Sequence, residues 1–99
     1  MWTVLLMPAA EVQADDADGW WRNNRPDAPL LFRQELAAAI DLLETNPLVV
    51  PRYTSSHDVE LRRWLLPATR YHLYVEIDRA RTCARIVAVW SAARERLPR

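Results

Sequence analysis

The chain has 99 residues, of which 51% are hydrophobic and 26% charged, and it contains one glycine and one cysteine. This length suits one domain over residues 1–99, and this composition excludes an intrinsically disordered chain. No apolar run approaches the ~20 residues that a membrane helix needs, and the apolar residues 1–7 lack the basic flank of a signal peptide. A lone cysteine excludes an internal disulfide and suits a reducing compartment, so we expect a cytoplasmic protein with no membrane association.

The net charge of zero hides an uneven distribution of charge along the chain. Residues 1–50 carry eight acidic side chains against three arginines, a net −5, whereas residues 51–99 carry ten arginines against five acids, a net +5. All 13 basic residues are arginine, for which genomic base composition is the simplest explanation. The guanidinium group is nevertheless suited to carboxylate and phosphate, so the second half of the chain is suited to an anionic partner.

The first half of the sequence predicts one strand and two helices. The apolar residues 2–6 indicate a buried strand, and Pro8 then stands where a helix over about residues 9–23 begins, with Val12 and Trp20 facing inward. Residues 23–27 are typical of a turn. The second helix has apolar residues at helical spacing and ends at Asn46 before Pro47; they are Phe32, Leu36, Ile40 and Leu43.

The second half predicts three consecutive strands. Residues 47–59 indicate a loop, because they contain two prolines and a polar run. Residues 61–77 predict a hairpin that turns at Pro67, and residues 71–77 alternate between apolar and polar side chains. Residues 82–90 are apolar on both faces, as in an internal strand. The expected fold is α+β with the order β-α-α-β-β-β, in which a helical hairpin packs on a mainly antiparallel sheet.

Four segments, taken in order, carry a resemblance to a known family. Residues 43–47 are followed by the Arg-Arg-Trp-Leu-Leu-Pro segment of residues 62–67, by Thr-Arg-Tyr-His-Leu-Tyr at residues 69–74, and by Ala-Val-Trp at residues 88–90 with arginines after it. Together they resemble the RelE/ParE superfamily, over nearly the whole chain. The resemblance implies the toxin of a type II toxin–antitoxin (plasmid stabilization) system, inhibited by a cognate antitoxin that is ParD-like or similar. That superfamily contains inhibitors of DNA gyrase and ribosome-dependent mRNA endoribonucleases.

The residue types favour the gyrase-directed ParE branch. A metal-independent ribonuclease needs a general base, a general acid and cations for the developing phosphorane charge. His72 stands where several nucleases of the superfamily carry a strand arginine, Ser91 and Ala92 replace the His or Tyr expected after the last strand, and lysine is absent. A neutral chain also lacks the positive charge that helps a protein bind RNA. The alternatives are an endoribonuclease that acts on ribosome-bound mRNA and an inert toxin homologue.

The expected functional residues therefore contact an antitoxin or a target and do not catalyse a reaction. A histidine on the polar face of a strand, such as His72, is more often solvated than catalytic. Cys83 is most simply a residue of the core. The weak catalytic candidates are His72 and Arg70. We predict no cofactor and no metal site, a hetero-oligomer with the antitoxin, and gyrase or the mRNA-bearing ribosome as target. The predicted binding residues are Arg63, Arg70, His72, Tyr74, Trp90, Arg94 and Arg96.

Overall fold

The computed structural model describes residues 1–55 and 59–94, and it has the α+β architecture that the sequence predicts. The elements follow the order β-α-α-β-β-β with one additional short strand. In chain order they are β1 (Thr3–Leu6), α1 (Pro8–Asn24), α2 (Leu31–Thr45), the 3-10 helix η1 (Pro47–Val49), β2 (Arg52–Ser55), β3 (Glu60–Leu65), β4 (Tyr71–Asp78), β5 (Cys83–Ser91) and the 3-10 helix η2 (Ala92–Arg94).

The strands form one mixed sheet in the order β1-β5-β4-β3-β2. Strands β2 to β5 pair with their neighbours in antiparallel fashion, and only β1 lies parallel to its neighbour β5. The predicted mainly antiparallel sheet is therefore confirmed, as is the internal position of β5 between β1 and β4. Pro67 lies in the turn between β3 and β4, where its missing N–H costs no ladder hydrogen bond.

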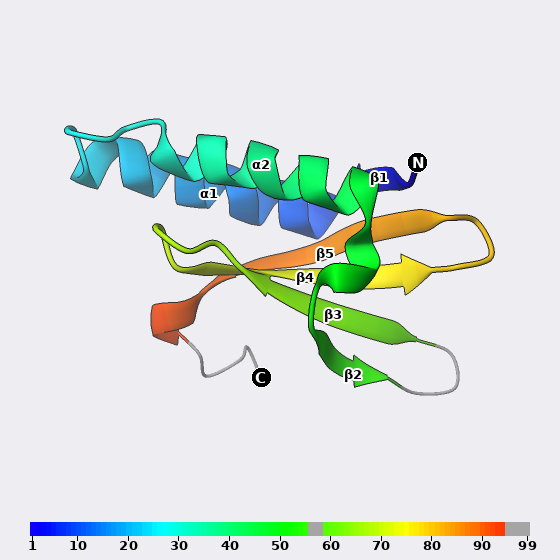
Figure 1. Ribbon diagram of the computed structural model, residues 1–99. Coiled ribbons are helices and arrows are strands. Elements are labelled where there is room, and N and C mark those ends of the chain that lie inside the picture. The colour runs from blue at the N-terminus through cyan, green and yellow to red at the C-terminus, as the bar shows by residue number, and fades with distance from the viewer. Residues whose placement is uncertain (56–58, 95–99) are drawn as a thin grey trace.

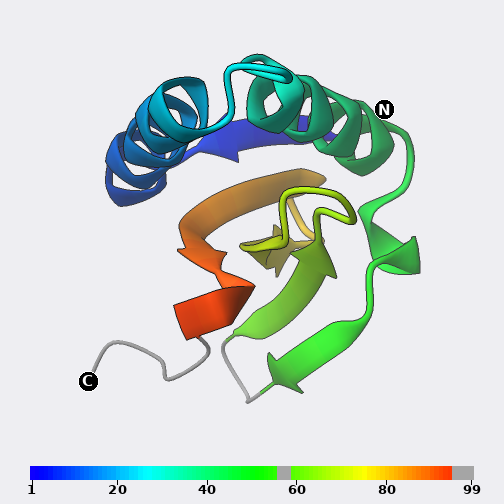
Figure 2. The same ribbon diagram turned by 90° about the vertical axis from the view of Figure 1, so that its left-hand side faces the viewer.

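Both helices cover the same face of the sheet, as Figures 1 and 2 show. The alternation in β4 decides which residues lie beneath them: Leu73, Val75 and Ile77 are buried in the core. From α2, Phe32 and Leu43 pack into the same core, each only 1% exposed. The intervening residues of β4 point to the opposite face, which no helix of the described chain covers and which we call the open face.

The predicted inward face of α1 is wrong. Val12 is 60% exposed and Trp20 48% exposed, whereas the buried side of the helix is made of Ala10, Ala14 and Ala17. These alanines recur at helical spacing, and their small side chains let α1 approach β5 closely. The two large apolar residues fall outside this stripe. A buried helix face made of alanine is difficult to predict from a sequence that has larger apolar residues at neighbouring positions.

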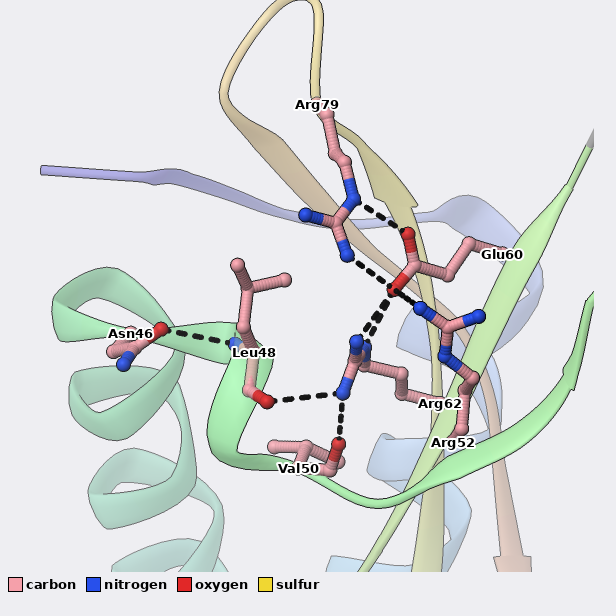
Figure 3. A network of polar contacts seen from close by, with 7 residues as sticks. All are labelled: Asn46, Leu48, Val50, Arg52, Glu60, Arg62 and Arg79. Atoms are coloured by element: carbon pink, nitrogen blue, oxygen red, sulfur yellow. Dashed lines mark hydrogen bonds and ion pairs between the residues drawn. The ribbon is translucent and has the colours of Figure 1, made fainter.

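The segment predicted as a loop over residues 47–59 contains η1 and β2, so this prediction is wrong for residues 47–49 and 52–55. Arg62 explains why the segment is held in place. Its buried guanidinium donates to the carbonyl oxygens of Leu48 at 3.0 Å and Val50 at 2.6 Å, and it pairs with Glu60 at 2.6 Å (Figure 3). The chain after α2 is thereby fixed beside β3, and β2 pairs with β3.

A second polar contact joins α2 to the turn between β3 and β4. The Glu35 carboxylate accepts hydrogen bonds from the backbone N–H groups of Ala68 at 2.7 Å and Thr69 at 2.8 Å, and from the Thr69 hydroxyl at 2.7 Å. The Glu35 side chain therefore satisfies three hydrogen-bond donors of this turn that have no partner in a neighbouring strand. No helix in the described residues is long and apolar enough to cross a membrane.

Candidate interaction surface

The strand register brings most of the predicted binding residues together on the open face. Arg63 of β3 lies opposite Tyr74 of β4, and His72 of β4 lies opposite Trp90 of β5. Residues directly opposite on one face have neighbouring side chains. Four predicted residues from three strands therefore share one surface.

An aromatic side chain from β2 completes this surface. The Tyr53 ring packs edge-on against Tyr74 with ring centroids 5.4 Å apart, and the Arg63 guanidinium lies 4.6 Å from the Tyr53 ring centroid. His72 lies on the other side of Tyr74, at 6.2 Å between ring centroids. We call Tyr53, Arg63, His72 and Tyr74 the aromatic–arginine patch. Three of them line a shallow hollow of about 300 Å³, and they are Tyr53, Arg63 and His72.

Tyr74 stands out within the patch because it is only 6% exposed on a face that no helix covers. Its hydroxyl is buried and has no hydrogen-bond partner among the described residues. A buried polar group without a partner costs about 1–3 kcal/mol, which the packing of Tyr74 against its neighbours has to offset.

Arg70 lies apart from the patch, in the turn before β4. Its backbone adopts a left-handed conformation with φ 65°, and its N–H donates to the Leu66 carbonyl oxygen at 2.9 Å. The side chain is exposed and lines a cleft of about 630 Å³ between the second half of α1 and the ends of β4 and β5. We call this the α1–β5 cleft. Trp90 lines it as well, so this residue adjoins both surfaces.

The acidic residues of the sheet neutralise several of its arginines. Hydrogen bonds from Arg79, and then from Arg62, lower the pKa of Glu60 to about 2 against the effect of burial. Hydrogen bonds from Arg85 and then Arg81 lower the pKa of Asp78 to about 2. Arg70, by contrast, forms no ion pair with any carboxylate that the structure describes.

Of the predicted binding residues at the C-terminal end, Arg94 ends η2 and Arg96 lies outside the described residues. Two contributors were missed by sequence reasoning. Tyr53 was assigned to a loop, although aromatic Tyr53 and β-branched Thr54 in adjacent positions favour a strand. The α1 wall of the cleft was missed because its members, including Trp21 and Arg25, are brought to β5 only by the tertiary packing.

His72 is the only histidine in residues 1–55 and 59–94, and Cys83 is buried among core residues. Within the same ranges no three His, Cys, Asp or Glu side chains lie close enough together to hold a metal ion. The aromatic–arginine patch presents a cation, two phenol rings and an imidazole on a rigid sheet.

No protein-family model matches this sequence, and no curated protein resembles it at a significant level.

Proposed function

We propose that this chain is the toxin of a type II toxin–antitoxin pair, of the RelE/ParE type, that acts in the cytoplasm by binding DNA gyrase. The observation that carries the proposal is the aromatic–arginine patch, on the sheet face that no helix of the described residues covers. Three of its four residues, Arg63, His72 and Tyr74, lie in segments at which the sequence resembles that superfamily. The α+β fold, with its helical hairpin on one face of the sheet, is compatible with the proposal, because it places the patch on the other face.

The patch favours binding over bond cleavage. General acid–base catalysis contributes about 10²–10⁴-fold and requires two positioned groups that exchange protons near neutral pH. Within the described residues His72 is the only histidine on the open face, and histidine is the residue type most often used for proton exchange near neutral pH. Arginine is protonated at any physiological pH and binds anions without exchanging a proton.

The proposal includes an antitoxin with an acidic segment that orders as it binds. Arg63 and Arg70 supply the positive charge that an acidic segment would contact. A disordered acidic segment that folds over this surface would cover Arg70, His72 and Tyr74 and form a hetero-oligomer.

The test is expression of the chain alone in a bacterial host, with growth followed beside two molecular assays. One assay measures supercoiling by gyrase and the other measures codon-specific cleavage of mRNA. We expect growth arrest with inhibited supercoiling, and we expect His72→Ala to retain it. Replacing Arg63 by Ala should raise the protein concentration needed to inhibit supercoiling about tenfold. Arginine is enriched among the interface residues whose truncation costs more than 1 kcal/mol, and 1.4 kcal/mol corresponds to a tenfold change in affinity.

Two other outcomes would replace the proposal. Cleavage of ribosome-bound mRNA that disappears in His72→Ala would make the protein an endoribonuclease of the RelE branch. Normal growth with full-level soluble expression would make it an inert homologue. The matched control is Arg81→Ala, since Arg81 lies in the turn between β4 and β5, away from the patch.

A further inference from the structure

Three arginine side chains converge on one carboxylate at the end of the sheet beside η1. The Nη2 atom of Arg62 lies 2.6 Å from Glu60 Oε2, and the Nη2 atom of Arg79 lies 3.0 Å from the same oxygen. The Nη2 atom of Arg52 lies 3.7 Å from it (Figure 3). We call Arg52, Arg62, Arg79 and Glu60 the arginine cluster. It places three positive charges around one negative charge.

The neighbouring carboxylates do not compensate for this positive surplus. Asp78 pairs with Arg81 at 3.1 Å and with Arg85 at 3.0 Å, and Glu76 pairs with Arg85 at 3.4 Å. Among the described residues, Glu60 is the only carboxylate that forms an ion pair with an arginine of the cluster. Three guanidinium groups and one carboxylate therefore leave the cluster with a net charge of +2.

The two outer arginines keep hydrogen-bond donors that the cluster does not use. The side chains of Arg52 and Arg79 are 56% and 53% exposed. Arg79 donates to Glu60 through Nε and Nη2, which leaves its Nη1 without an acceptor in the described chain. The Arg52 guanidinium is too far from Glu60, at 3.7 Å, for a hydrogen bond, and it forms none with another described residue. Both groups can therefore donate to a second anion from solvent.

Arg62 fixes this arrangement from the buried side. Its side chain is 9% exposed, and it donates to two backbone carbonyl oxygens in and just after η1 as well as to Glu60. The outer arginines come from separate segments, Arg52 from β2 and Arg79 from the turn between β4 and β5 (Figure 3). Because the Glu60 carboxylate already orients both outer guanidinium groups, a ligand that binds them causes a smaller loss of side-chain entropy.

A phosphate dianion matches the charge and the donors of the arginine cluster. A phosphate monoester carries a charge of about −1.5 to −2 at pH 7 and has three acceptor oxygens. Guanidinium groups bind such oxyanions through two parallel N–H donors. We propose that Arg52 and Arg79 bind a phosphate dianion beside Glu60, either free phosphate or the phosphate group of a monoester. This inference does not depend on the proposed toxic activity, because no residue of the arginine cluster belongs to the aromatic–arginine patch.

The probe is inorganic phosphate, titrated at pH 7 and constant ionic strength into the purified full chain labelled with nitrogen-15. NMR follows the Nε–H signals of the arginines. We expect the signals of Arg52 and Arg79 to shift and saturate, and the signal of Arg81, which pairs with Asp78, to stay in place. Phenyl phosphate is titrated in the same way. An affinity equal to that of phosphate would assign the site to a monoester, and a lower affinity would assign it to the free ion.

Substitutions test whether the two outer arginines hold the ligand. Arg52→Gln and Arg79→Gln should each weaken phosphate binding about tenfold, because each removes charge-assisted hydrogen bonds. Arg81→Gln is the matched control, since it removes the same charge from an exposed side chain outside the cluster, and it should change the affinity by no more than about twofold. Circular dichroism verifies that each variant is folded.

Thermal unfolding provides a second measurement. Phosphate stabilises many proteins without binding to a site, so the double variant Arg52→Gln with Arg79→Gln reports this general effect. At about five times the dissociation constant, phosphate should raise the thermal midpoint of the parent chain by roughly 4–8 °C more than that of the double variant.

Three results would overturn the proposal. The first is a titration in which neither the Arg52 nor the Arg79 signal saturates. The second is an affinity that Arg81→Gln lowers as much as Arg79→Gln does, which would show a general attraction of phosphate to the arginine-rich half of the chain. The third is dimethyl phosphate, a monoanion, binding as tightly as phosphate, which would show that the site has no preference for a dianion.

Discussion

Arg62 shows how one buried side chain can hold a segment in place. Its side chain is 9% exposed, and its guanidinium joins the carbonyl oxygens of Leu48 and Val50 to the Glu60 carboxylate. Arg79 and Arg52 approach the same carboxylate from the surface, at 2.8 Å and 3.7 Å (Figure 3). The desolvated arginine compensates for its burial by satisfying all three acceptors, so removing it takes this donor from the Leu48 and Val50 carbonyl oxygens and leaves Glu60 with only the surface arginines.

Replacing Arg62 by Met should lower the free energy of unfolding by about 2–4 kcal/mol, because the Leu48 and Val50 carbonyl oxygens lose their donor while Glu60 keeps its pairs with Arg79 and Arg52. Chemical denaturation followed by circular dichroism measures this loss. Arg81→Met is the control, because the Arg81 side chain is 77% exposed and such a surface change alters stability by no more than about 0.5 kcal/mol. Equal effects of the two changes would contradict the role assigned to Arg62.

The pKa of Glu60 leads to a prediction about acid stability. Arg79 and Arg62 lower this pKa from 4.5 in the unfolded chain to about 2 in the folded one. The stabilisation is therefore complete above pH 4.5 and is lost as the pH falls toward 2. Glu60→Gln should lower the free energy of unfolding at pH 7 by about 1–2 kcal/mol and remove that part of its dependence on pH. The loss is smaller than the pKa shift alone implies, because Arg52 and Arg79 are half-exposed and screened by solvent.

The measurement is the free energy of unfolding at a series of pH values for both proteins. Their stabilities should differ at pH 7 and converge below pH 3. Asp78 also has a pKa of about 2, so the variant retains part of the acid dependence. Parallel pH profiles would contradict the assignment to Glu60.

Glu35 should stabilise the fold more than an exposed acidic residue of α2 does. Glu35→Ala removes the acceptor for three donors of the turn between β3 and β4, at a cost of about 1.5–3 kcal/mol. Asp41→Ala on the same helix is the control, since Asp41 is exposed. Thermal unfolding of both variants measures the two losses of stability. A Glu35 variant as stable as the Asp41 variant would show that the three hydrogen bonds to Glu35 do not stabilise the fold.

At the scale of the elements, α1 is a helix whose sequence is poorly suited to its position. Gly19 and the acidic residues around it disfavour a helix, yet α1 runs unbroken over Pro8–Asn24. Packing explains this outcome. The alanine stripe lies against β5, and Asp18 pairs with Arg22 at 2.9 Å and with Arg33 of α2 at 2.7 Å. Tertiary contacts supply the stability that local propensity lacks.

Gly19→Ala should stabilise the protein by about 0.5–1 kcal/mol, because alanine restricts the unfolded chain and favours the helix. The space exists, since no heavy atom lies within 4 Å of a Cβ added at Gly19. The thermal midpoint should rise by roughly 2–8 °C. Ala38→Gly, at an exposed position of α2, should lower it by a similar amount; a Gly19 variant that is less stable than the parent would show an unfavourable contact.

At the scale of the whole molecule, the two halves of the sequence become two layers of opposite charge. Residues 1–50, with their net −5, contain β1 and the helical layer, and the arginine-rich second half forms most of the sheet, as Figure 2 makes visible. The net charge of zero is therefore the sum of an acidic layer and a basic layer. Such a separation orients charged partners over distances of about one Debye length.

The chain should accordingly bind weakly to both anion- and cation-exchange resins at pH 7 and low salt, and to neither above about 0.2 M salt, where screening is strong. Arg63→Glu combined with Arg70→Glu should abolish retention on the cation exchanger and leave retention on the anion exchanger. Asp41→Lys, in the helical layer, should have the opposite effect. A wild-type protein that passes through both columns at low salt would contradict the layered charge distribution.

The sequence by itself determined the elements whose side chains repeat with a clear period. The alternation in β4, the apolar spacing in α2 and the proline between β3 and β4 each fix a local conformation through the geometry of the backbone. Together they predicted the element order, the helical hairpin and the mainly antiparallel sheet. They also predicted that His72 and Tyr74 would share the polar face of β4, because the faces of one strand follow from residue parity alone.

Only the tertiary structure decided which features meet across the sheet. The inward face of α1 was assigned to the wrong residues, since alanines gain their value from the closeness of β5 and not from their own hydrophobicity. Strand β2 was missed because residues 47–55 are held by Arg62, and hydrogen bonds to a side chain 14 residues away leave no periodic signal. The α1–β5 cleft has the same origin: β1 ends before β5 does, and a difference in the length of two paired strands exists only once they are paired.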